Sequence, residues 1–69
     1  MKYAVISLTE GTSGTRVWNG HPLGVEDGTG LADGLNALTT RGWTLTTATT
    51  VTGPAGLLHT LFMVAPSAG

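Results

Sequence analysis

Apolar and β-branched residues gather in short runs whose spacing predicts strands and one helix. The first run, residues 2–9, contains the strand-favouring types Tyr3, Val5 and Ile6 and ends at a Glu-Gly pair. Both alternating sets of this run carry apolar residues. The pattern therefore predicts a strand that is covered on both faces for part of its length.

Two runs near the C-terminal end predict two further strands. Residues 43–51 are rich in Thr, and Trp43, Leu45 and Val51 share one parity. Residues 57–64 are apolar on both parities, and a Gly-Pro connection at 52–56 separates the two runs. We expect an antiparallel hairpin here, with the first strand beside one of its strands. A helix crossover allows that neighbour to be parallel.

The helix prediction depends on three leucines. Leu31, Leu35 and Leu38 stand at i, i+4 and i+7 and so share one helical face. Thr29 is positioned to cap the start of this helix, and Gly42 suits the left-handed residue just beyond its end. Gly34 is unfavourable inside a helix, and it is interpreted as allowing close approach to the sheet.

These elements predict a single domain over residues 1–69. The fold class is α+β with the order β-(β)-α-β-β, in which one helix packs on one face of a three- to four-stranded sheet. Residues 9–30 form a loop-rich insertion in which 16–19 is a candidate short strand, and residues 67–69 are expected to be a flexible tail.

Composition narrows the function classes. The 69 residues carry only three Lys or Arg and a net charge of −1, too few cations for a nucleic-acid surface. No apolar run is long enough to span a membrane, so a cytoplasmic location without a membrane partner is expected. The chain has no Cys, which excludes disulfides. A domain this small usually needs an external support, and self-association fits the low charge.

The last strand has more apolar surface than one short helix covers, which predicts a homo-oligomer. The predicted interface set shares one parity of that strand and consists of Leu57, His59, Leu61 and Met63. The other parity, with Leu58, Phe62 and Val64, is the alternative. A second alternative is that residues 9–28 fold over the outer face, with Val17, Trp18 and Leu23 as a lid.

A glycine- and hydroxyl-rich loop precedes the candidate short strand and is a candidate anion site. Its predicted ligand-binding residues, with Trp18 added as a stacking platform, are Thr12, Ser13, Gly14, Thr15, Arg16 and Trp18. No Walker-type Lys-Ser or Lys-Thr pair follows at the required spacing. An ordinary hairpin turn is the alternative interpretation.

Other polar residues predict little chemistry. His21 with Glu26 and Asp27 has the ligand types for a metal, but solvated charges before a helix explain the carboxylates as well. His59 suits a pH-sensitive interface group, or simply a histidine hydrogen-bonded on a sheet. No pair is positioned for acid–base catalysis, so no catalytic residue, metal site or cofactor is expected.

The helix and the strand after it resemble a known family. The segments Leu35-Asn36-Ala37-Leu38 and Arg41-Gly42-Trp43-Thr44-Leu45 are similar to the LNxLxxxGWELV signature of domain of unknown function 4177, short proteins of bacteria and their phages. The Tyr-containing first strand and the aromatic before Pro66 also match. Thr44 departs from the usual Glu, and a basic residue near the Pro is missing. The resemblance implies a β-α-β-β fold and no activity.

Two functions are weighed. The leading hypothesis is a non-enzymatic homo-oligomeric interaction or assembly module whose partner is itself. The alternative is a protein that binds or sequesters a small anionic or nucleotide-like signal, such as a phage-encoded sponge against a host defence. An enzyme is not expected.

Overall fold

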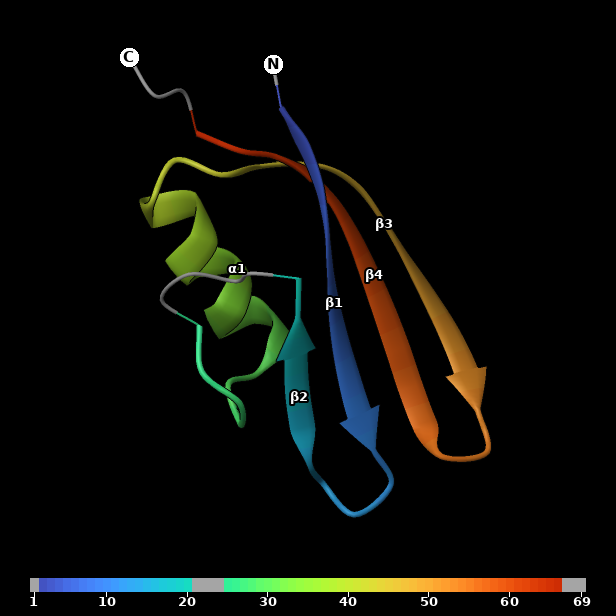
Figure 1. Ribbon diagram of the computed structural model, residues 1–69. Helices are drawn as coiled ribbons and strands as arrows, with labels where there is room; N and C mark the ends of the chain where they lie inside the picture. Colours follow the sequence, from blue (N-terminus) through green and yellow to red (C-terminus); the bar gives the residue numbers. More distant parts are fainter. Residues whose placement is uncertain (1, 21–24, 67–69) are drawn as a thin grey trace.

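The computed structural model describes residues 2–20 and 25–66 and has one helix packed on one face of a sheet (Figure 1). The elements are, in chain order, β1 (Tyr3–Gly11), β2 (Arg16–Asn19), α1 (Leu31–Thr40), β3 (Thr44–Gly53) and β4 (Gly56–Val64). The predicted α+β class and element order are thereby confirmed. The predicted tail at 67–69 lies outside the described residues.

The four strands are antiparallel throughout and follow the order β2-β1-β4-β3. Strands β1 and β4 form the centre, paired from Tyr3 opposite Val64 to Gly11 opposite Gly56. The expected hairpin of β3 and β4 is present. Both neighbours of β1, which are β2 and β4, are antiparallel to it, so the parallel neighbour that the helix crossover allowed is not found among the described strands. The helix returns the chain so that β3 runs in the direction of β1, but β4 lies between them.

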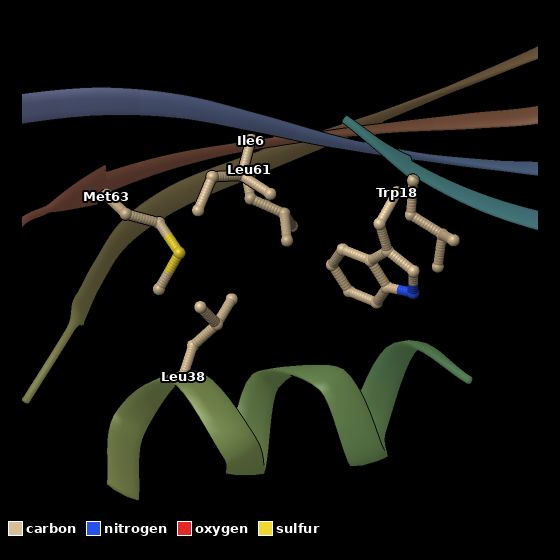
Figure 2. Packing of buried hydrophobic residues seen from close by; sticks show 6 residues of the cluster. Ile6, Trp18, Leu38, Leu61 and Met63 are labelled. Carbon is tan, nitrogen blue, oxygen red and sulfur yellow. The ribbon is translucent and has the colours of Figure 1, made fainter. Parts of the chain in front are cut away.

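The core lies between the sheet and α1 (Figure 2). Its buried side chains come from β1, β2, β4 and the helix, and they are Ile6, Leu8, Trp18, Leu38, Leu61 and Met63. Residues of a strand point alternately to the two faces of its sheet, so one parity of β1 and one of β4 supply this core. Leu31 and Leu35 pack against it from α1, as their spacing predicts.

The ends of α1 differ in how well the sequence predicts them. Gly30, and not Thr29, is the N-cap, and no side chain caps the helix; the Thr29 carbonyl instead accepts a hydrogen bond from Trp18 Nε1 at 2.9 Å. At the other end Gly42 has φ +92°, and the N–H groups of Gly42 and Trp43 donate to the carbonyls of Thr39 and Leu38. This pair of bonds is a Schellman motif, and it confirms the predicted stop at Gly42.

A bulge in β3 changes which residues share a face. The register with β4 shifts between Leu45 and Thr47, so that Leu45 lies opposite Met63 while Val51 lies opposite Leu58. Because the bulge adds one residue to β3, the alternation reverses there. Leu45 and Val51 therefore lie on opposite faces, and the prediction that they share a face is wrong.

The candidate strand at 16–19 is confirmed as β2, which extends the sheet at one edge. The described part of the predicted lid does not cover the sheet face that points away from α1. Val17 lies on that face as part of the sheet, paired with Thr9, whereas Trp18 points the other way into the core. Leu23 lies outside the described residues.

Candidate functional site

The sheet face that points away from α1, called the outer face below, is the most unusual surface of the molecule. It is formed by the strand residues whose parity is opposite to the core set, and no element among residues 2–20 and 25–66 packs on it (Figure 1). Its large exposed apolar side chains come from all four strands and are Tyr3, Val5, Val17, Val51, Leu58 and Phe62. Exposed apolar residues scattered singly are ordinary, but neighbouring ones mark interaction sites.

Cross-strand pairing makes these side chains neighbours. Val5 lies directly opposite Phe62, and Val17 lies opposite Thr9, which in turn lies opposite Leu58. Val51 then lies opposite Leu58 from the other side. Cβ atoms in such pairs are about 4.5–5.5 Å apart, so the side chains touch. The apolar residues therefore form rows that cross the sheet.

A row of hydroxyl side chains separates the two apolar rows. Ser7 lies opposite Thr60, and Thr60 lies opposite Thr49. The three hydroxyls lie side by side across β1, β4 and β3, at the middle of the outer face. Each hydroxyl can donate one hydrogen bond and accept others, so this row suits a polar contact that fixes the position of an apolar partner.

The outer face carries no charged side chain in the described strands. Glu10 and Arg16 lie opposite each other on the other face, and β3 and β4 contain no Asp, Glu, Lys or Arg. Two copies of a charged face repel each other, whereas two copies of a neutral face do not. The outer face is thus compatible with a second copy of itself.

A shallow apolar groove of about 240 Å³ marks one end of the outer face. It lies where the β3–β4 hairpin turns, and Val51, Leu58 and Pro54 contribute to its walls beside Thr9 of β1. The groove continues the row formed by Val51 and Leu58, so the apolar surface extends to the tip of the hairpin.

The predicted anion loop is the turn of the β1–β2 hairpin. The exposed residues Thr12, Ser13, Gly14, Thr15 and Arg16 all lie in it or at its end. The N–H groups of Gly11 and Gly14 donate to carbonyls within the turn, and that of Thr12 donates to the Ala55 carbonyl. These three amides are already occupied, so the hairpin interpretation accounts for their geometry. Anion binding stays a prediction.

Trp18 is not part of that loop surface. It is only 6% exposed and belongs to the core, where its ring lies against Gly34 of α1. An indole enclosed in this way has no free face for a planar ligand. The proposed stacking role of Trp18 is therefore wrong, because its parity on β2 turns it under the helix.

Two of the four predicted interface residues also belong to the core. Leu61 and Met63 are 1% and 0% exposed, and α1 covers them, so a second copy has no access to them (Figure 2). His59 is buried as well, and Leu57 is half-buried. The parity chosen for the interface is the one that faces the helix. The alternative parity, with Leu58 and Phe62, is the one that faces solvent.

His59 takes part in a polar row that crosses the sheet on the helix side. Its Nδ1 lies 2.8 Å from Thr50 Oγ1 on β3, and its Nε2 lies 3.6 Å from Glu10 Oε2 on β1. Arg16 Nε on β2 is 3.8 Å from the other Glu10 oxygen. The interpretation of His59 as a histidine hydrogen-bonded on the sheet is confirmed.

Metal binding has little support among the described residues. No group of three His, Cys, Asp or Glu side chains with metal-binding geometry occurs in residues 2–20 and 25–66. Asp27 accepts a hydrogen bond from the Trp18 N–H at 2.9 Å, and Glu26 is exposed. His21 lies outside the described residues. Within the same part of the chain, α1 is too short to cross a membrane.

Comparison of the chain with protein families, curated proteins and solved structures finds no match. The resemblance to domain of unknown function 4177 therefore stays a prediction. The outer face is therefore the candidate interaction surface that the structure indicates. Sequence patterns indicated its existence through the double apolar parity of β1 and β4, but only the position of α1 decides which parity is exposed.

Proposed function

We propose that this protein is a non-enzymatic self-assembly module and that its outer face packs against the outer face of a second copy. The supporting observation is the exposure of neighbouring apolar side chains from four strands, with Tyr3 70% and Val51 60% exposed. Burying such side chains contributes about 1.5–3 kcal/mol each when burial is complete. A cytoplasmic location belongs to the same proposal.

The size of the outer face supports this proposal. Strands β1 and β4 have nine residues each. At about 3.3 Å per residue and about 4.8 Å between strands, a four-stranded face measures about 30 by 19 Å. Two such faces, with allowance for the short β2, bury about 1,000 Å² together, which is near the lower bound for a specific interface.

Val5→Glu tests the proposal, because it places a charge among the apolar side chains without touching the core. We expect the parent protein to form a multimer at micromolar concentration and the variant to form a smaller species, measured by native mass spectrometry and analytical ultracentrifugation. An unpaired charge buried in an interface costs several kcal/mol, enough to disrupt this contact.

Asn36→Glu is the matched control, since it adds the same charge on the exposed side of α1. This variant is expected to keep the parent mass. Circular dichroism of both variants verifies that the fold is retained. A parent protein that stays monomeric, or a folded Val5→Glu variant with the parent mass, contradicts the proposal.

A further inference from the structure

The two edge strands, β2 and β3, differ in whether other parts of the chain form hydrogen bonds to their outward sides. At the β2 edge, the Trp18 N–H donates to Asp27 Oδ1 at 2.9 Å, and the Gly28 N–H donates to the Arg16 carbonyl at 2.8 Å. Residues 27 and 28 thus occupy two outward backbone groups of β2, the Trp18 N–H and the Arg16 carbonyl. An edge covered in this way is protected against pairing with another strand.

The β3 edge is open. All ten residues from Thr44 to Gly53 are exposed. In an antiparallel pair, alternate residues direct their N–H and C=O groups away from the partner strand, so half of these groups in β3 point outward. In residues 2–20 and 25–66, no other segment forms a backbone hydrogen bond to that side of β3.

Strand β3 also lacks most of the features that usually protect an edge. Its sequence contains neither Pro nor a charged residue, and only the bulge near Thr46 interrupts its regular geometry. Exposed edges without such protection pair with other strands. The contrast between the long open β3 edge and the partly covered β2 edge at the opposite end of the sheet favours β3 as the site for a partner strand.

The sequence of β3 favours a second copy of the same strand as that partner. In the regular part of the strand the sequence is symmetric about Ala48, because Thr47 and Thr49 flank it and lie on the same face, whereas Leu45 lies beyond the bulge. Two identical antiparallel strands related by a two-fold axis place residue 48 opposite itself and residue 47 opposite residue 49. Threonine then faces threonine across the junction, a favourable cross-strand pair.

We propose that β3 pairs antiparallel with β3 of a second copy, with the two-fold axis at Ala48. The result is a continuous eight-stranded sheet that carries both helices on one side and joins the two outer faces on the other. Ala48, Thr47 and Thr49 lie beyond the bulge, where the ladder with β4 is regular. This inference rests on the proposed self-assembly but uses a different surface of the molecule.

Charge exchange at Ala48 tests this arrangement. The side chain of Ala48 is exposed and lies on the helix side of the sheet, opposite Leu61, so a substitution there leaves the outer face unchanged. In Ala48→Lys or Ala48→Asp the two axis residues repel each other at about 5 Å. We expect edge pairing in each variant to weaken about tenfold to a hundredfold.

An equimolar mixture of the two variants is expected to restore the pairing, because Lys then lies opposite Asp. Native mass spectrometry resolves the mixed species by mass. Asn36→Lys and Asn36→Asp, mixed in the same way, are the controls and are expected to assemble like the parent. Loss of pairing without recovery in the mixture contradicts a two-fold axis at Ala48.

Disulfide formation gives a second readout. The chain has no Cys, so Ala48→Cys introduces the only thiol, and a self-pairing position brings it near its own copy. We expect rapid oxidation to a covalent dimer, compared with slow oxidation of Asn36→Cys. Equal rates contradict the edge pairing. The variants distinguish the two surfaces. If Ala48→Lys assembles like the parent while Val5→Glu does not, only the edge pairing is contradicted. If Val5→Glu assembles like the parent while Ala48→Lys does not, only the outer-face contact is contradicted.

Discussion

One residue, Trp18, connects three separate parts of the chain. Its indole lies against Gly34 of α1, its Nε1 donates to the Thr29 carbonyl at 2.9 Å, and its backbone N–H donates to Asp27 at 2.9 Å. A buried indole needs a partner for its N–H, and Thr29 supplies one. Trp18 thereby holds β2, the segment before the helix and the helix together.

Gly34→Ala tests this contact. Alanine is about 1 kcal/mol more favourable than glycine in a helix interior, but its Cβ at this position would overlap the Trp18 ring. Displacement of the ring weakens the packing and the Nε1 hydrogen bond, so we expect a net loss of about 1–2 kcal/mol in the free energy of unfolding. Urea denaturation followed by tryptophan fluorescence measures it. Asn36→Ala, exposed on the same helix, is expected to be neutral or stabilising, and an equal gain in both variants contradicts the packing role of Gly34.

At the scale of elements, the junction of α1 and β3 depends on the left-handed conformation of Gly42. A residue with a Cβ is disfavoured at φ +92°, and this Cβ would also lie 2.9 Å from that of Pro66. Gly42→Ala is therefore expected to lower the free energy of unfolding by about 1–2 kcal/mol, measured by thermal and urea denaturation. Gly42→Asn should cost less, because Asn tolerates this conformation better. Equal losses for Ala and Asn would show that contact with Pro66 dominates.

Sequence patterns predicted the elements better than their faces. The leucine spacing of α1, the stop at Gly42 and the Thr-rich β3 are local properties, and each was recovered. The face of β4 that meets the helix was not, because Leu61 and Phe62 are equally apolar and only tertiary packing distinguishes them. The bulge at Leu45–Thr47 leaves no mark in a run of threonines, so the faces of β3 could not be read from parity.

For the candidate surfaces, too, the sequence predicts that they exist but not which residues form them. The excess of apolar strand surface over what one helix covers is visible in the sequence, whereas the residues that carry it depend on the position of α1. Burial of Trp18 was also missed, since it stands among the Gly, Ser and Thr residues of a loop-like segment. Its signal is weak. A single aromatic in a four-residue strand gives no periodicity from which a face can be assigned.

At the scale of the whole molecule, residues 2–20 and 25–66 leave one sheet face covered by α1 and the other uncovered, and this asymmetry has an energetic consequence. Among the described residues, the core contains six buried apolar side chains, while six large apolar side chains on the outer face and Leu45 on the helix side remain in solvent. A domain of this size buries only about 60% of the surface that its unfolded chain exposes. The proposed association through the outer face would add burial that the chain does not obtain alone, and stability would then rise with protein concentration.

The lack of charge on the proposed contact surfaces predicts how salt affects the assembly. Between about 0.1 M and 1 M salt the Debye length falls from about 10 Å to about 3 Å, which weakens contacts between exposed charges. The described strands carry no charged residue on the outer face, and β3 carries none at all. We therefore expect sodium chloride to leave the dissociation constant nearly unchanged, while sodium sulfate lowers it by favouring apolar burial. Sedimentation equilibrium measures both. Steep weakening in sodium chloride would instead indicate that charged groups such as Glu10 and Arg16 hold the copies together. Those groups lie on the helix side of the sheet, so the contact surface would have to be reassigned to that side.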